Sequence, residues 1–218
     1  GYVMTDHILN AVDFGVPENR ERVFIIGIRS DLNLNFHWKF VREQSLTIAE
    51  AISDLPELKE GQSVNSYTMP AQNLYQLLMR GTNKELTQHF CGFYGDKIRT
   101  VIENVGQGQG KDDFNALIDE GKIRSDYRLT SGYHNTYGRL VANLPSTTIT
   151  NNMCTPSGLR CIHYAQNRAL SPREGARIQS FPDWFKFSGT RTDVTKQIGN
   201  AVPPLLAIKL ANQIARIL

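Results

Sequence analysis

RVFIIGIR, residues Arg22–Arg29, is a nearly continuous apolar run bounded by arginines. Such a run predicts a β-strand buried on both faces, because a strand with one wet face would alternate apolar and polar residues. Residues 15–19, GVPEN, precede the run and are typical of a tight turn. We therefore expect Ile8–Phe14 to be a partner strand, and the two strands to form a hairpin that ends in a core strand.

Two short helices are indicated by their first residues. Thr47 and Glu50 have the spacing of a capping box, in which each side chain bonds the backbone of the other, and Pro56 follows the expected helix. Residues 171–174, SPRE, form a second box with proline at the first helical position. We expect this second helix to run through Gln179, because Phe-Pro follows shortly after.

The last helix is expected to begin at the prolines 203–204. Its apolar residues recur at helical spacing, which predicts that one stripe packs on a core. Residues 59–136 lack clear periodicity and are rich in glycine and small polar residues, so an irregular, loop-rich region is expected there. The predicted stripe consists of Leu206, Leu210, Ile214 and Ile217.

The composition is that of an ordinary globular protein. Of 218 residues, 40% are hydrophobic and 21% are charged. There is no long uncharged apolar stretch and no basic-then-apolar leader, so neither a membrane span nor a secretory signal is expected. Cys91, Cys154 and Cys161 lack the spacing of metal ligands and are odd in number, which predicts reduced structural thiols and no metal site.

The net charge of +3 hides an uneven distribution. Residues 1–120 hold 11 Lys/Arg against 17 Asp/Glu, whereas residues 121–218 hold 13 against 4. The second part is therefore strongly basic. A basic segment favours a polyanionic partner such as nucleic acid, but an ordinary solvated basic surface is an equally simple explanation of charge alone.

Residues 16–23, VPENRERV, combine a turn, two arginines and the start of the predicted buried strand. Two further segments follow in order: residues 168–183, RALSPREGARIQSFPD, and residues 197–204, QIGNAVPP. The three segments resemble the eighth, ninth and tenth conserved blocks of DNA cytosine-5 methyltransferases. Apart from its variable middle, the chain is covered by the resemblance.

The resemblance implies a reaction on a cytosine that has been flipped out of duplex DNA. A cysteine thiolate adds to C6 of the base, a glutamic acid protonates N3, and C5 takes the methyl group of S-adenosylmethionine before a base removes the C5 proton. Arginine suits the binding of such a base, because its planar guanidinium presents several donors in fixed directions.

By the same resemblance, Arg22 is the candidate for binding the flipped cytosine. Arg20 is expected beside it, contacting the DNA backbone or bracing the site. Asn200, Ala201 and Val202, which precede the last helix, are the candidates for contacting S-adenosylmethionine. An isolated Arg-X-Arg would more simply project to a solvated edge, but the following strand and the two later blocks favour the functional interpretation.

One position departs from the family pattern, since Glu18 stands where the family usually has glutamine. An ionised carboxylate only accepts hydrogen bonds and would repel phosphate, so we expect Glu18 to pair with an arginine or to mark altered substrate handling. Arg139, Arg173 and Arg177 are candidates for contacting DNA. For Arg173 and Arg177, the resemblance favours a second role, the bracing of the target-recognition region.

No Pro-Cys dipeptide, the family's nucleophile context, occurs in the chain, and the Gly-rich strand-turn of the cofactor site is also missing. We therefore expect an incomplete enzyme, inactive alone, with its nucleophile outside this chain. The expected fold is α/β. Residues 1–45 supply the last strands of a Rossmann-like S-adenosylmethionine methyltransferase domain, 46–156 an inserted loop-rich α+β target-recognition domain, and 157–218 the bracing block and closing helix.

The implied function is recognition of a specific duplex DNA sequence for cytosine-5 methylation, in a bacterial restriction-modification system. The expected partners are double-stranded DNA and an N-terminal catalytic half or subunit that carries the Pro-Cys nucleophile. Such a protein would be cytoplasmic and associated with the nucleoid. Two alternatives stay open: the small subunit of a split methyltransferase, and a non-catalytic sequence-specific DNA-binding module.

Overall fold

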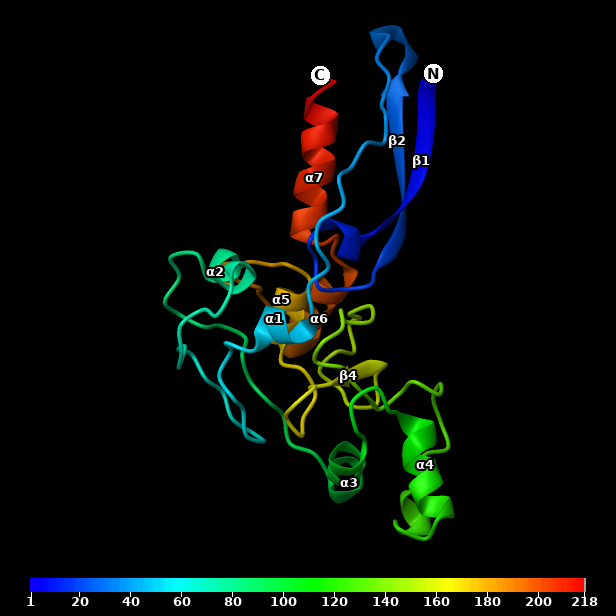
Figure 1. Cartoon of the computed structure of the whole chain (residues 1–218), viewed down its shortest axis with the longest axis vertical. Coiled ribbons are helices and arrows are strands. Elements are labelled where there is room, and N and C mark those ends of the chain that lie inside the picture. Colours follow the sequence, from blue (N-terminus) through cyan, green and yellow to red (C-terminus); the bar gives the residue numbers. More distant parts are fainter. Residues whose placement is uncertain (218) are drawn as a thin grey trace.

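The computed structural model describes residues 1–217 and shows an elongated, mixed α/β molecule in three parts (Figure 1). A long β-hairpin and the last helix form one end, short helices gather in the middle, and the helices at residues 96–104 and 111–119 lie at the opposite end. The elements are β1 (Tyr2–Asn10), β2 (Glu21–Arg29), α1 (Ile48–Ile52), α2 (Leu74–Arg80), α3 (Asp96–Asn104), α4 (Lys111–Asp119), β3 (Gly138–Arg139), β4 (Arg160–Ile162), α5 (Pro172–Ile178), α6 (Arg191–Asn200) and α7 (Pro204–Ala215), with 3-10 turns at Ala11–Phe14, Ser30–Leu32 and Ser125–Tyr127.

The hairpin has the predicted order of strands but different bounds. β1 and β2 are antiparallel and stay in one register over their whole length. Residues Ala11–Phe14, predicted to belong to the first strand, form a 3-10 turn instead. The Asn10 side chain accepts a hydrogen bond from the Val12 N–H and caps this turn, so the chain leaves the sheet at Asn10.

The apolar run of β2 is not buried on both faces, and the prediction of a fully buried strand is wrong for this chain. Alternate residues of β2 are half-buried, whereas Val23 and Ile25 are 59% and 64% exposed. The physical reason is that a two-stranded ribbon has two faces, and the rest of the described chain packs on one of them. The other is here called the open hairpin face; it consists of Tyr2, Met4, Ile8, Val23 and Ile25.

The covered face of the hairpin packs against residues 36–40, which are rich in aromatic side chains, and against the first turn of α7. Trp38 of that segment stacks on His7 at 5.5 Å between ring centroids, and its indole N–H donates to the Thr5 hydroxyl at 2.9 Å. α7 begins at Pro204, as predicted. Of its predicted apolar stripe, Leu206 is buried, whereas Leu210, Ile214 and Ile217 are half-buried.

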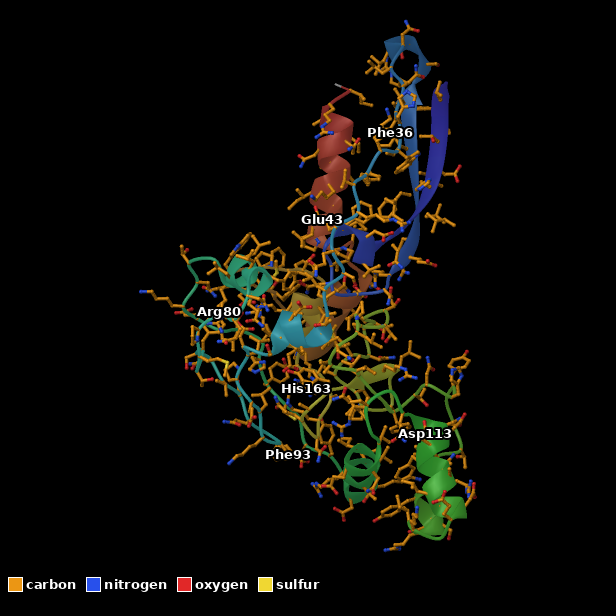
Figure 2. The ribbon with its side chains drawn as sticks, in the orientation of Figure 1. Phe36, Glu43, Arg80, Phe93, Asp113 and His163 are labelled. Atoms are coloured by element: carbon orange, nitrogen blue, oxygen red, sulfur yellow. The ribbon has the colours of Figure 1, made fainter. Side chains whose placement is uncertain are left out.

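The middle of the molecule holds its largest apolar core, which is densely filled by side chains (Figure 2). Both predicted capping boxes are present: Thr47 with Glu50 begins α1, and Ser171 with Glu174 begins α5. The core is shared by α1, α2, α5 and α6. It therefore includes residues from both sides of the predicted boundary at 156.

The end of the molecule opposite the hairpin is a separate small packing unit, here called the distal unit, residues 95–137. Its helices α3 and α4 enclose Phe114, which is fully buried, and connect to the centre where β3 pairs in parallel with β4. The apolar core of the distal unit consists of Val101, Val105, Phe114, Ile118 and Leu129. Within residues 1–217, no helix is both long and apolar enough to cross a membrane.

Candidate functional site

The base of the hairpin borders two adjoining hollows, here called together the Arg22 recess. The first has a volume of about 220 Å³ and is lined by Arg22 together with Asn200, Ala201 and Val202. The second, of about 380 Å³, is lined by Arg22, Asn200 and residues 148–151. The predicted base-binding arginine and the three predicted cofactor residues therefore border one recess, although about 180 residues of sequence separate them.

The two arginines of the hairpin have different environments. The Arg22 side chain is exposed, with its Nη1 donating to the neighbouring Glu21 carbonyl at 2.6 Å. Arg20 is buried, and its two terminal nitrogens donate to the carbonyls of Ile149 at 3.1 Å and Gly199 at 2.8 Å. Arg20 therefore braces three segments around the recess. Burial lowers the pKa of Arg20, against the opposing effect of the nearby Glu18 carboxyl.

Glu18 lies next to Arg20 and is fully buried. Its Oε1 accepts a hydrogen bond from the Ile149 N–H at 2.6 Å and lies 3.5 Å from Nη1 of Arg20. The predicted pairing of Glu18 with an arginine is thus present, at a long distance. Burial raises the pKa of Glu18 to about 7, because the hydrogen bond from Ile149 and the charge of Arg20 offset only part of the lost hydration.

Residues 199–202 reach the recess because α6 ends there. Asn200 is the last helical residue, and the chain continues in an extended conformation. Gly199 lies against the backbone of residues 150–151: a Cβ at this position would be 2.4 Å from the Asn151 nitrogen, so a larger residue would push the two segments apart. Val202 is 48% exposed beside the recess. Residues 199–202 are therefore close-packed against residues 150–151 on one side and border the recess on the other.

Two parts of this site were not predicted from the sequence. α6 itself was not predicted, although Thr190 and Asp193 form a capping box that signals its start. Residues 148–151, TITN, line the recess opposite Arg22 and were not predicted to do so. Their position depends on the Glu18 and Arg20 contacts, which join residues far apart in the chain.

A family model described as C-5 cytosine-specific DNA methylase matches residues 1–216. The chain belongs to this family. Type II methyltransferase M.DdeI of Desulfomicrobium norvegicum is 34% identical over 243 residues, which cover 99% of this chain and 55% of the relative. Type II methyltransferase M.NgoFVII of Neisseria gonorrhoeae is 32% identical, over 98% of this chain and 50% of the relative. The chain thus spans about half the length of these curated relatives.

The fold of this C-5 cytosine methylase chain also occurs in a solved structure. A candidate DNA modification methyltransferase encoded within an E. coli prophage superposes with a TM-score of 0.70 at 20% sequence identity. The match covers 99% of this chain and 61% of the other. At this identity the likeness shows the shared fold, which is that of a DNA methyltransferase.

Arg139, predicted to contact DNA, is buried in this methylase chain. Its guanidinium donates to the carbonyls of Ile102 and Val105 at the end of α3, both at 2.6 Å. It also donates to the carbonyls of His163 and Gln166 and to the side chain of Asn167. Arg139 therefore fastens the distal unit to the centre instead of facing a phosphate.

Arg173 and Arg177, also predicted to contact DNA, are both 0% exposed on α5. Arg173 donates to the backbone and hydroxyl of Thr87 at 2.9 and 2.8 Å. Arg177 lies between Asp54 and Asp183, with nitrogen–oxygen distances of 2.6 Å to each. In this arrangement neither guanidinium is exposed, and the donors of both are used inside the chain, as a bracing role would require.

Burial and ion pairing act on Arg177 in opposite directions. Burial lowers the pKa of its guanidinium, but the hydrogen bonds and charges of Asp183 and Asp54 outweigh burial, and the net pKa is raised. The same ninth block contains a second buried pair, in which Arg168 holds Glu174 through two hydrogen bonds of 2.7 and 2.5 Å. This block is therefore an internal brace of the methylase fold.

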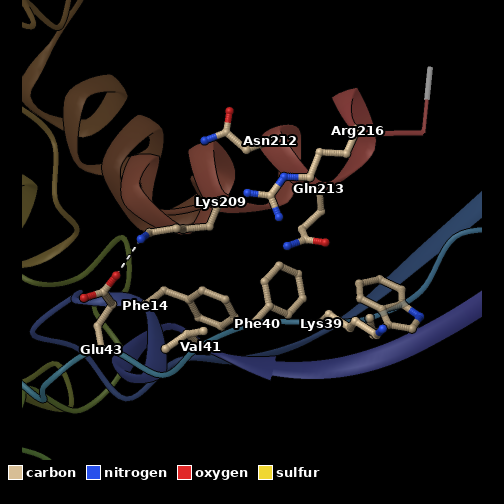
Figure 3. Close-up of a pocket in the computed structure, with 10 residues that line it drawn as sticks. Phe14, Lys39, Phe40, Val41, Glu43, Lys209, Asn212, Gln213 and Arg216 are labelled. Atoms are coloured by element: carbon tan, nitrogen blue, oxygen red, sulfur yellow. Dashed lines mark hydrogen bonds and ion pairs between the residues drawn. The ribbon is translucent and has the colours of Figure 1, made fainter.

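A larger groove lies away from the predicted residues, between α7 and residues 38–43 (Figure 3). It has a volume of about 590 Å³ and an aromatic floor that includes Phe14 and Phe40. Lys209 of α7 closes one end through an ion pair of 2.5 Å with Glu43. The groove contains none of the predicted catalytic or cofactor residues, and its polar rim is shared by the last helix and residues 38–43.

Proposed function

We propose that this chain supplies DNA target recognition and part of the cytosine and cofactor pockets of a DNA cytosine-5 methyltransferase. The reaction is transfer of the methyl group of S-adenosylmethionine to C5 of a cytosine in a specific duplex sequence. The observation that carries this proposal is the Arg22 recess, where an exposed arginine faces Asn200, Ala201 and Val202. Family membership and the type II relatives support the same assignment.

In this proposal, Arg22 binds the flipped cytosine. Its side chain is exposed at the recess, and a guanidinium can donate to the base carbonyl and to a flanking phosphate in fixed directions. Arg20 holds the walls of the recess, since its donors are already used by the carbonyls of Ile149 and Gly199. Arg22 thus contacts the substrate, and Arg20 is its brace.

Asn200, Ala201 and Val202 are proposed to contact S-adenosylmethionine. The sulfonium sulfur of this cofactor carries the methyl group that is transferred. The recess beside these residues combines the Asn200 amide with apolar walls from Phe24 and Leu206, a combination that suits a ligand with polar and apolar parts. The small side chains of the turn leave its backbone accessible to such a ligand. These residues therefore fit one wall of a cofactor pocket.

The nucleophile is proposed to come from a polypeptide segment other than this one. No Pro-Cys dipeptide occurs in the chain, and all three cysteines are buried away from the recess. The open hairpin face is an apolar surface that suits packing against the rest of a methyltransferase domain, which an N-terminal half or a separate subunit would supply. Double-stranded DNA is the proposed substrate, in a bacterial restriction-modification setting within the nucleoid.

The test mixes this chain with a polypeptide that carries the family's Pro-Cys segment and measures transfer of labelled methyl groups to DNA. We expect activity in the mixture and none with this chain alone. Arg22→Ala should lower methylation at least about tenfold more than it lowers DNA affinity, because the substitution removes a base contact and few phosphate contacts. Arg124→Ala, at an exposed arginine paired with Asp126, is the matched control.

Two outcomes would contradict the proposal. Equal losses of methylation and DNA affinity in Arg22→Ala would identify Arg22 as a phosphate contact. Specific DNA binding without methyl transfer, in a folded mixture and on all sequences tested, would instead favour a non-catalytic DNA-binding module.

A further inference from the structure

The carboxyl of Glu18 has no role in the reaction proposed above, yet it lies at a junction of the fold. It is fully buried under the Arg22 recess. Its side chain accepts the Ile149 N–H, and its backbone forms a parallel bridge with Ser146. Glu18 therefore ties the turn of the hairpin to the segment that forms the opposite wall of the recess.

As an anion, this carboxyl is poorly compensated. Within residues 1–217, its Oε2 has no hydrogen-bond partner. Arg20 is the nearest cation, but its Nη1 and Nη2 already donate to the carbonyls of Ile149 and Gly199, and its distance to Oε1 is 3.5 Å. A buried charge without direct donors on both oxygens is costly, so the neutral acid is favoured.

The charged and titratable groups that act on Glu18 come from two elements. Arg20 and Arg22 of the hairpin favour the ionised form, whereas burial opposes it more strongly and raises the pKa to about 7. Tyr75 of α2 is also near enough to interact electrostatically. Its hydroxyl donates to the Arg177 carbonyl at 2.5 Å and is therefore not a donor to Glu18.

We propose that Glu18 is a positioning residue that, in its neutral form, holds Ile149 and leaves Arg20 on its two carbonyl partners, and that loosens these walls of the Arg22 recess when it ionises. In the neutral state, Arg20 keeps both of its carbonyl contacts. An ionised carboxylate attracts Nη1 away from the Ile149 carbonyl and draws water to Oε2. The recess is therefore best formed below neutral pH. The effect on methylation rests on the proposed function, whereas the titration itself does not.

The titration is measured directly by NMR on the full chain with carbon-13 in the glutamate side-chain carboxyls. The Glu18 signal is identified by its loss in Glu18→Gln. We expect a midpoint near pH 7, and a shift of the Ile149 amide with the same midpoint. A midpoint below about pH 5, the range of an ordinary glutamate, would overturn the proposal.

Stability gives an independent measurement, whose sign follows from linkage. The folded pKa of about 7 lies above the ordinary glutamate pKa of 4.5, so the unfolded chain loses its proton first as pH rises. The folded-to-unfolded ratio of the wild type should therefore fall by up to about 300-fold, relative to Glu18→Gln, between about pH 4.5 and pH 8. Glu21→Gln, at an exposed glutamate of the same hairpin, should follow the wild type. Superimposable curves for wild type and Glu18→Gln would contradict the proposal.

Methylation by the reconstituted enzyme tests the link to the recess. Glu18→Gln should keep its activity from pH 6.5 to 8.5, whereas the wild type should lose activity over this range. Glu18→Ala, which removes the contact with Ile149, should be impaired at every pH. If the NMR midpoint holds but the two pH profiles coincide, Glu18 does not control the recess and this part is wrong. Failure of the wild type to methylate contradicts the proposed function and leaves the NMR and stability results to decide the titration.

Discussion

Replacing Arg177 by methionine is expected to cost the protein a large part of its stability. The guanidinium is 0% exposed and lies between two carboxylates. Nη1 is 2.6 Å from Asp54, and Nη2 and Nε are 2.6 and 3.0 Å from Asp183. Methionine retains the apolar stem of the arginine and removes its charge and donors. Two buried carboxylates would then lose their shared cation.

The size of the stability loss depends on the hydrogen bonds that each carboxylate retains. Removing one partner of a buried ion pair typically costs about 3–5 kcal/mol. Asp54 retains a hydrogen bond of 2.6 Å from Arg80, which lies on α2 (Figure 2), and Asp183 retains one of 2.5 Å from Tyr67. We therefore expect the lower end, about 3 kcal/mol. For a chain of this size, that corresponds to a fall in Tm of about 6–12 °C.

Urea denaturation followed by circular dichroism measures this loss. Arg124→Met is the control, since Arg124 and its partner Asp126 are 73% and 55% exposed, and an exposed pair contributes less than about 1 kcal/mol. Adding Asp54→Asn and Asp183→Asn to Arg177→Met should restore part of the stability by removing the uncompensated charges. A loss in Arg177→Met no larger than that in Arg124→Met would refute the bracing role.

Two further predictions concern other buried groups. Arg139→Lys should weaken attachment of the distal unit by about 2–3 kcal/mol, because one ammonium cannot replace donors directed at five acceptors. Limited proteolysis should then cleave residues 95–137 faster while the hairpin stays intact. Unchanged cleavage of these residues would count against the prediction. Burial raises the pKa of Cys154 to about 12 and that of Cys161 still further, so both thiols should resist iodoacetamide at pH 8 until the protein is denatured. Rapid alkylation of the native protein would contradict the burial of these thiols.

Features with a local cause were predictable from the sequence. Capping boxes depend on residues three positions apart, and those at residues 47–50 and 171–174 begin helices as expected. The turn at residues 15–19 is likewise determined by neighbouring residues, and it brings two strands into a hairpin. Roles for Arg22 and for residues 200–202 were assigned through family resemblance, but no local pattern in the sequence indicates that they lie close together.

Features that depend on distant partners were not predictable. Arg177 has the same local context as an arginine on an exposed helix, and its burial depends on Asp54, which is 123 residues away. Arg20 likewise depends on Gly199, at a separation of 179 residues. The exposure of Val23 and Ile25 also escaped prediction, because an apolar run indicates what a strand can bury and not what is present to cover it.

The central core also has a consequence for synthesis of the protein. Tyr75 and Asp54 both bond Arg177, across 102 and 123 residues, so the core cannot close until α5 has emerged from the ribosome. At roughly 5–20 residues per second, about 100 residues take about 5–20 s. During that time the apolar side chains of α1 and α2 have no core to enter. A nascent chain with these side chains exposed is expected to bind chaperones, and slower translation after residue 80, where α2 ends, would lengthen its exposure to aggregation.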